Sequence, residues 1–292
     1  MKKRLLPLVV TLLTLCAVVQ AATAKPIADS AESNTVIKSA PLYGKTINVI
    51  GDSYVKNHKR PFTEAWHYLV AEKYHMTYRN YGRNGRCLVF NREAEKWGKP
   101  LLDFYKEMND TADYVLVIGG HNDADYIARG KGTLEQFETG LDSLCRGLIA
   151  KYPTAKLAFV TPWRVPRPCF NEVIGIMVKV CGRYSIPVFN AAERSGIYVW
   201  DAQFRKLFFQ GPNDTAHLNA KGHRLFMRKG ESFLLGLYTA GRQHRQAALH
   251  CAVGQGHLPG LRPWSPTLFP LNISSGYCPT ILAGCYFPLL MI

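Results

Sequence analysis

Thr46-Ile47-Asn48-Val49-Ile50 runs directly into Gly51-Asp52-Ser53, and this stretch decides the fold. A short apolar run bounded by a turn predicts a buried β-strand. Ser53 is then expected where the strand ends and a helix begins, among free backbone N–H groups. That is the place of a nucleophile in an α/β hydrolytic enzyme. By itself the triplet is more typical of a plain turn with a helix-capping residue than of a nucleophile.

Strand and helix patterns alternate along the chain after this stretch. The expected strands are 46–50, 76–80, 114–118, 157–160 and 186–190, and the expected helices are 63–75, 133–150, 171–182 and 219–237. Such alternation predicts an α/β fold with a parallel sheet and helices on both faces. In these folds binding sites form where loops leave the carboxyl ends of the strands.

The two ends of the chain differ from its middle. Residues 1–24 combine a basic start, an apolar run and the small-residue site Ala22-Thr23-Ala24, which predicts a signal peptide and a secreted or periplasmic protein. The run is short for a membrane anchor, the alternative reading, so no span is expected in the mature protein. Residues 25–44 are expected to be a linker and 45–238 the domain. Residues 239–292 are an atypical tail, disordered or spurious by composition, with a partner-binding segment as the alternative.

The net charge of +15 could attract acidic glycans or anionic surfaces. The chain has no basic helix with interleaved aromatic residues, so nucleic-acid binding is not expected. Basic residues gather after the proposed nucleophile, at Lys56, His58, Lys59 and Arg60. A solvated basic rim is the plain interpretation of that group.

Four cysteines lie inside the domain, and the sequence leaves their pairing open. They are Cys87, Cys145, Cys169 and Cys181, which allow three pairings in an oxidising compartment. Cys181 falls on the apolar stripe of its predicted helix, so a buried free thiol is as consistent with the sequence as a disulfide.

Four short signals follow one another in a set order and together supply the parts of an acyl-transfer site. Ser53 is the candidate nucleophile, His217 the candidate base, and Asp214 stands three residues before it to hold the imidazole. Gly85 and Asn122 are candidate oxyanion donors through a backbone N–H and a side-chain amide. Asp and His also bind metals, but no further ligand types stand at regular spacing, so no metal is expected.

These signals resemble the four blocks of the SGNH (GDSL-type) hydrolases, and the resemblance covers roughly residues 45–238. It implies a three-layer, flavodoxin-like sandwich with a five-stranded parallel sheet. It also implies ester hydrolysis through an acyl-enzyme, with no metal or organic cofactor. Ser53 would be the nucleophile and His217, supported by Asp214, the base. The Ser53 N–H, the Gly85 N–H and the Asn122 side chain would form the oxyanion hole.

Several substrates remain open within that resemblance. An exported member without an added domain fits removal of O-acetyl groups from carbohydrate, so the expected partner is a small ester or an acetylated polysaccharide. Trp163 could stack on a sugar, and Arg164 beside it could pair with a uronate carboxylate. The alternatives are an acyltransferase, a lysophospholipase or thioesterase of the same fold, and a non-catalytic glycan-binding protein. A monomer is expected.

Overall fold

The structure is a computed structural model that describes residues 35–253, with side chains as far as residue 238. The predicted signal peptide, the first half of the predicted linker and residues 254–292 of the predicted tail lie outside the described residues. Within the segment 25–44, residues 35–39 are helical and Leu42 is fully buried in the core.

A five-stranded parallel sheet forms the middle layer, as the sequence predicts. Its strands are β1 (Thr46–Gly51), β2 (Thr77–Gly82), β3 (Tyr114–Ile118), β4 (Lys156–Val160) and β5 (Val188–Phe189). They lie in the order β2-β1-β3-β4-β5, and every neighbouring pair is parallel. This is the flavodoxin-like strand order, whose ligand sites lie beyond the carboxyl ends of the central strands. The predicted three-layer, flavodoxin-like sandwich is therefore confirmed.

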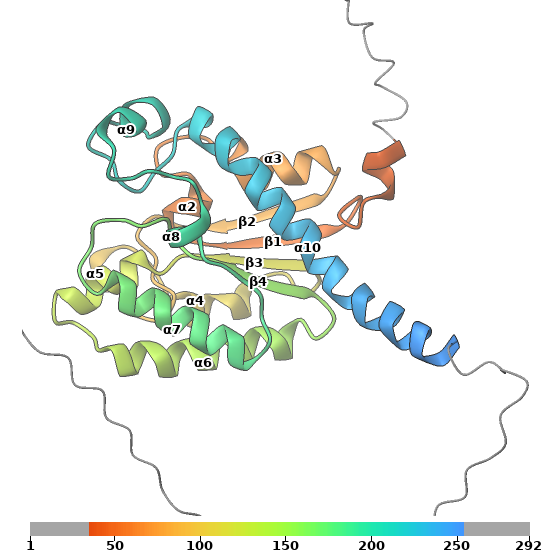
Figure 1. Cartoon of the computed structure of the whole chain (residues 1–292). Helices are drawn as coiled ribbons and strands as arrows, with labels where there is room; N and C mark the ends of the chain where they lie inside the picture. The colour runs from red at the N-terminus through yellow and green to blue at the C-terminus, as the bar shows by residue number, and fades with distance from the viewer. Residues whose placement is uncertain (1–34, 254–292) are drawn as a thin grey trace, which may run out of the picture. The chain divides into compact units, whose positions relative to one another are not determined.

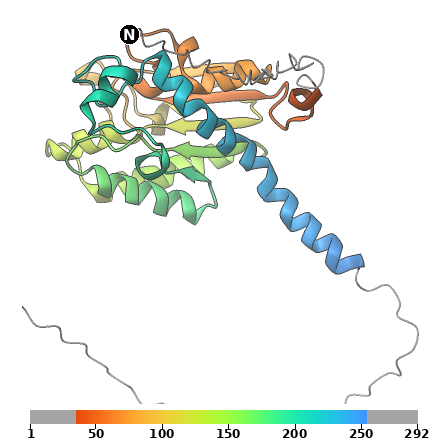
Figure 2. The ribbon, with the colours of Figure 1, turned by 45° about the horizontal axis from the view of Figure 1, so that its top comes forward.

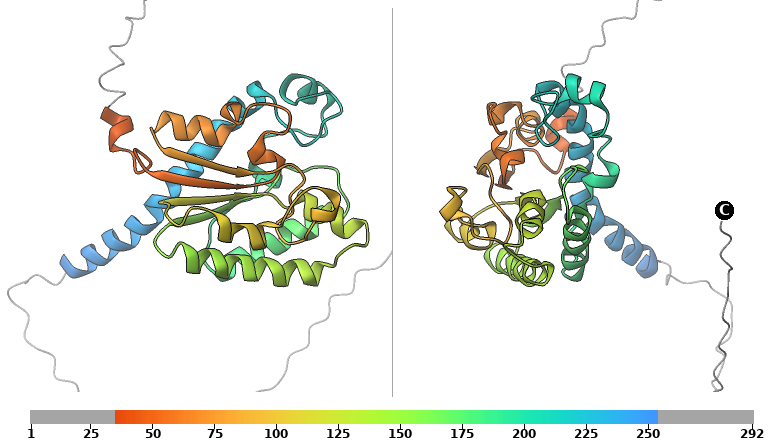
Figure 3. Two further views of the ribbon diagram at one scale, coloured as in Figure 1. Left: turned by 180° about the vertical axis from the view of Figure 1, so that it is seen from behind. Right: turned by 90° about the vertical axis from the view of Figure 1, so that its left-hand side faces the viewer.

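Helices cover both faces of the sheet (Figures 1 and 3). The helices α3 (Trp66–Lys73) and the first turns of α10 (Ala220–Val253) lie on one face, where the rings of Trp66 and Phe226 pack with centroids 5.2 Å apart. The other face carries α4 (Leu101–Phe104), α6 (Leu134–Lys151) and α7 (Phe170–Arg183). The sequence predicts an end for the last helix near residue 237, but α10 continues to Val253.

Local sequence explains why the longest internal helix begins where it does. Thr133 Oγ1 accepts a hydrogen bond from the Gln136 N–H, and Gln136 Oε1 accepts one from the Thr133 N–H. This is the predicted capping box, which satisfies two backbone donors at the start of α6. The apolar stripe of the helix is fully buried in the core and consists of Phe137, Leu141, Leu144 and Leu148.

Short helices gather at the carboxyl end of the sheet (Figures 1 and 2), and the sequence predicts only the first of them, which begins at Ser53. They are α2 (Ser53–Lys56), α5 (His121–Ala128), α8 (Ala191–Arg194) and α9 (Ala202–Phe208). Single 3-10 turns occur at Phe62–Glu64, Glu93–Glu95 and Tyr105–Glu107. Among the helices that the structure describes, none has the length and apolar character needed to cross a membrane.

Candidate active site

The structure presents Ser53 at the junction of the central strand and a short helix. Ser53 is the first residue of α2, and Asp52 caps that helix by accepting the Tyr54 N–H at 2.8 Å. Gly51 allows the turn because a Cβ there would stand 2.1 Å from the Ile118 carbonyl oxygen. The serine is only 5% exposed, so its hydroxyl is held in a fixed place.

Ser53, His217 and Asp214 form a continuous line of hydrogen bonds. His217 Nε2 lies 2.9 Å from Ser53 Oγ, and His217 Nδ1 lies 2.9 Å from Asp214 Oδ2. The other carboxylate oxygen of Asp214 accepts the backbone N–H groups of Ala216 and His217 at 2.8 and 2.9 Å. The structure thus brings together the three residues that the sequence proposes as nucleophile, base and orienting acid.

The environment of Asp214 favours its charged form. Burial alone would raise the pKa of this carboxyl, but hydrogen bonds from the His217 ring and from two backbone N–H groups hold it below its usual value. A carboxylate at Oδ2 fixes the proton of His217 on Nδ1, which leaves the Nε2 lone pair directed at the Ser53 hydroxyl. That tautomer is the one a general base requires.

The segment that carries His217 is braced from two sides. The backbone N–H of Gln210 donates to the His217 carbonyl at 2.8 Å, and Trp163 Nε1 donates to the Ala216 carbonyl at 2.9 Å. Trp163 is 2% exposed and packs against Tyr54 and Phe226, so its ring offers no face to a sugar. The prediction that Trp163 offers a stacking surface to a sugar is wrong, because its indole packs inside the core.

Arg164, the other predicted substrate contact, is exposed and lies apart from the triad hydrogen bonds. Its guanidinium donates to the Asn171 side chain at 2.8 Å and to the Ala192 carbonyl at 3.4 Å. The structure therefore places Arg164 on the rim beyond β4, toward α8.

The three proposed oxyanion donors differ in the partners that they already have. The Ser53 N–H belongs to the first turn of α2, where backbone donors lack partners within a helix. Gly85 has φ +73°, and a Cβ there would lie 2.3 Å from the Trp97 ring. The Asn122 amide donates to the Arg86 carbonyl at 3.0 Å and to Asp52 Oδ2 at 3.3 Å. To serve an oxyanion, Asn122 must share or release a hydrogen bond, and the longer one to Asp52 is the weaker.

A buried group of polar side chains supports this loop, and the sequence analysis missed it. Asp123 accepts the Leu88 and Val89 N–H groups at 2.8 and 3.0 Å and so anchors the segment just after Gly85. Burial raises the pKa of Asp52 to about 8 and lowers the pKa of His121 well below its usual value. Their 3.3 Å contact at neutral pH therefore joins a carboxylic acid and a neutral imidazole, not an ion pair.

His58 is a further residue of the site, which the sequence analysis placed only in a basic rim. Its ring stacks on the ring of His217 with centroids 4.0 Å apart. Partial burial and the neighbouring His217 lower the pKa of His58, so it is neutral at neutral pH. A histidine five residues after the nucleophile was the only signal available in the sequence.

Metal and thiol chemistry are the two alternatives to a serine nucleophile at this site. Among residues 35–238, whose side chains the structure describes, no group of three or more His, Cys, Asp or Glu side chains could hold a metal ion. Cys87, Cys145 and Cys181 are buried, Cys169 is half-buried, and all four are free thiols. Burial raises the pKa of Cys87, the thiol nearest to Gly85 in the sequence, which opposes its use as a nucleophile.

Comparisons with known proteins bear on the family and the fold of this chain. The profile of the GDSL-like Lipase/Acylhydrolase family matches residues 49–225. Among solved structures, a protein from Lactobacillus plantarum matches with 20% identity and a TM-score of 0.56, covering 66% of this chain and 97% of its own. A carbohydrate acetylesterase from Sinorhizobium meliloti, Est24, matches with 15% identity and a TM-score of 0.51, covering 66% and 100%. An M. smegmatis aryl esterase matches with 16% identity and a TM-score of 0.50, covering 66% and 99%. These likenesses establish the fold, and no curated protein matches the sequence.

Proposed function

Because this chain belongs to the GDSL-like lipase/acylhydrolase family, and its family is one of ester hydrolases, we propose that it is a serine esterase in which Ser53 attacks the ester. One observation carries the proposal: Asp214, His217 and Ser53 are joined by two hydrogen bonds of 2.9 Å. A nucleophile, a base and a group that orients the base are the parts that acyl transfer needs.

The first half of the proposed reaction forms an acyl-enzyme. Ser53 Oγ bonds to the ester carbonyl carbon while its proton moves to His217 Nε2. The carbonyl oxygen becomes an oxyanion, which would accept hydrogen bonds from the Ser53 and Gly85 N–H groups and from the Asn122 amide. Asp214 stabilises the imidazolium that forms. The bond to the alcohol then breaks, and the alcohol leaves with the proton from His217.

The second half returns the enzyme to its starting state. His217 takes a proton from water, and the hydroxide oxygen bonds to the acyl carbon. The bond to Ser53 Oγ breaks, the serine recovers its proton from His217, and the carboxylic acid leaves. If a sugar hydroxyl took the place of water, the same steps would transfer the acyl group. Product analysis with added sugar acceptors separates hydrolysis from transfer.

We further propose that the acyl group is acetyl, that the alcohol is a carbohydrate, and that the enzyme acts outside the cytoplasm. A small acyl group is supported by the near-complete burial of Ser53 and Asn122 and by the Trp97 ring against Gly85. The predicted signal peptide supports export. The acetylesterase from Sinorhizobium meliloti shares the fold.

Two measurements test the proposal. Ser53→Ala should abolish p-nitrophenyl acetate hydrolysis while its circular dichroism spectrum and thermal midpoint stay close to those of the native protein. A fluorophosphonate probe should label the native protein and not the variant. Retained hydrolysis in a folded Ser53→Ala variant would refute the serine mechanism. Acetate release from acetylated xylan, compared with hydrolysis of p-nitrophenyl esters of rising chain length, tests the substrate class.

A further inference from the structure

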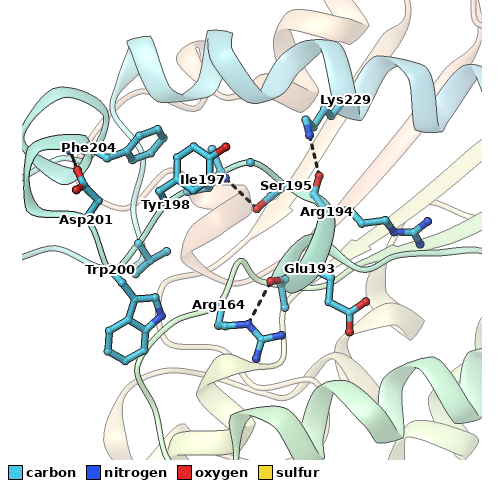
Figure 4. A pocket seen from close by; sticks show the side chains of 13 residues that line it. Arg164, Glu193, Arg194, Ser195, Ile197, Tyr198, Trp200, Asp201, Phe204 and Lys229 are labelled. Carbon is cyan, nitrogen blue, oxygen red and sulfur yellow. Dashed lines mark hydrogen bonds between the residues drawn. The ribbon is translucent and has the colours of Figure 1, made fainter.

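A large cavity lies at the carboxyl end of the sheet, outside the triad. It has a volume of about 940 Å³ and is bordered by the segment that joins α8 to α9, by Arg164 and by Lys229 of α10 (Figure 4). Two aromatic side chains of that segment are unusually open: Tyr198 is 65% exposed and Trp200 is 68% exposed. Large exposed aromatic rings at a cavity are typical of a binding site.

The cavity also carries three cations that have no ion-pair partner in the part of the chain that the structure describes. Among the described residues, no carboxylate lies within ion-pair distance of Arg164, Arg194 or Lys229, whereas half of the other twelve arginines in residues 35–238 have such a partner. Lys229 instead donates to the Arg194 carbonyl at 2.9 Å. Two acids, Glu193 and Asp201, also line the cavity, and Asp201 caps α9 by accepting the Phe204 N–H. A ligand with a carboxylate would complement this charge.

Covalent and hydrogen-bonded links connect the cavity to the proposed active site. Arg164 directly follows Trp163, whose indole donates to the Ala216 carbonyl one residue before His217. The helix α9, which borders the cavity, leads into the catalytic segment, where Phe209 pairs with Leu218. A second hollow of about 410 Å³ shares Arg164 and Trp200 with the first. These links tie the lining of the cavity to the segment that carries His217.

We propose that this cavity is a subsite for an acidic polysaccharide, which holds a uronate-bearing sugar near the acetylated sugar at Ser53. The inference rests on the proposed esterase function. The ring of Trp200 or Tyr198 would stack on the apolar face of a sugar, and Arg164 would pair with the uronate carboxylate. An aromatic ring beside an arginine is the arrangement that the sequence analysis sought at Trp163, and the structure provides it with Trp200.

Binding to an inactive enzyme tests the subsite directly. In the Ser53→Ala protein, polygalacturonate should bind more tightly than unsubstituted xylan by isothermal titration calorimetry, and the preference should fall as salt rises. Adding Trp200→Ala or Arg164→Gln should weaken polygalacturonate binding roughly ten-fold. Trp200→Phe should recover part of the loss. Arg146→Gln, on the exposed side of α6, is the matched charge control and should change nothing.

Activity on two substrates separates this inference from the proposed function. If Ser53 is required for p-nitrophenyl acetate hydrolysis, but the Ser53→Ala protein binds both glycans equally or Trp200→Ala leaves binding unchanged, the subsite is refuted and the esterase stands. If a folded native protein hydrolyses no ester of the panel, the proposed function fails, and the subsite fails with it even if the glycan binds. Selective loss of acetylated pectin turnover relative to p-nitrophenyl acetate in Arg164→Gln supports both.

Discussion

The imidazole of His58 lies parallel to the imidazole of His217, with centroids 4.0 Å apart and 10° between the ring planes. The backbone fixes this contact, because the His58 N–H donates to the Ser53 carbonyl at 3.1 Å and His58 takes a left-handed conformation at φ +46°. The ring of His58 is thus tied to the helix that starts with Ser53. It covers one face of His217, whose edges are held by Ser53 and Asp214.

We predict that His58 positions His217 for proton transfer. His58→Ala should lower kcat about 3- to 10-fold with little change in KM, which corresponds to the ~0.5–1.5 kcal/mol of an aromatic pair. His58→Phe keeps a flat ring over His217 and should restore most of kcat. Steady-state kinetics with p-nitrophenyl acetate measure both variants. Equal losses in the two variants would mean that stacking is not the function of His58.

After Ser53 and His217, Asp214 should be the residue whose substitution lowers kcat most. Asp214→Asn removes the charge and favours the tautomer of His217 that carries its proton on Nε2, facing Ser53. We expect kcat to fall by roughly 10²- to 10⁴-fold, while KM changes little. The variant should remain folded, because the amide oxygen can still accept the Ala216 and His217 N–H groups. A loss smaller than ten-fold would contradict the orienting role.

Gly85 should not tolerate a side chain, for two separable reasons. Its φ of +73° strains any L-residue, and a Cβ would collide with the Trp97 ring. We predict that Gly85→Ala lowers both kcat and the free energy of unfolding, by about 1–2 kcal/mol for the backbone term alone. Adding Trp97→Ala should recover only the steric part of the lost stability and should not restore kcat.

Urea unfolding and steady-state kinetics of the single and double variants, with Trp97→Ala as the reference, separate the backbone strain at Gly85 from the steric contact with Trp97. Recovery of kcat in the double variant would show that the steric contact, and not the direction of the Gly85 N–H, limits catalysis.

The pattern of apolar residues in the sequence predicts the strands and therefore the sheet. It also predicts that Ser53, Asp214 and His217 come together, because the loops that leave parallel strands meet at one edge of the sheet. It does not predict the direction of a loop side chain. Trp163 turns inward because Tyr54 and Phe226, distant in sequence, provide a buried surface for it. Trp200 stays outside because no such surface meets it. The stacking of His58 was equally hidden, since it depends on an uncommon φ angle in a short connection.

Two buried histidines should make the fold sensitive to acid. Burial lowers the pKa of His67 to about 4 and that of His223 to about 3. The Nδ1 atom of His223 faces the Trp66 N–H at 3.3 Å, and its Nε2 lies 3.0 Å from Asn57 Oδ1. A proton on Nδ1 would therefore set two donors against each other. The folded state must keep this ring neutral, whereas the unfolded chain can protonate it below about pH 6.5.

These pKa values determine the direction in which stability changes with pH. A folded-state pKa below the unfolded value gives stability that is fully present above pH 6.5 and is lost as the pH falls toward 3. Asp52 and Asp123, whose pKa values are raised to about 8 and about 7, act in the opposite sense. Their effect cancels when the free energies of unfolding of two proteins that both contain these aspartates are subtracted.

His223→Gln removes one titrating group. The free energy of unfolding of the native protein should therefore approach that of the variant by about 1.4 kcal/mol per pH unit below pH 6.5. Urea unfolding of both proteins from pH 7.5 to 4.5 measures this difference, and curves that stay parallel throughout would show that His223 does not resist protonation in the fold.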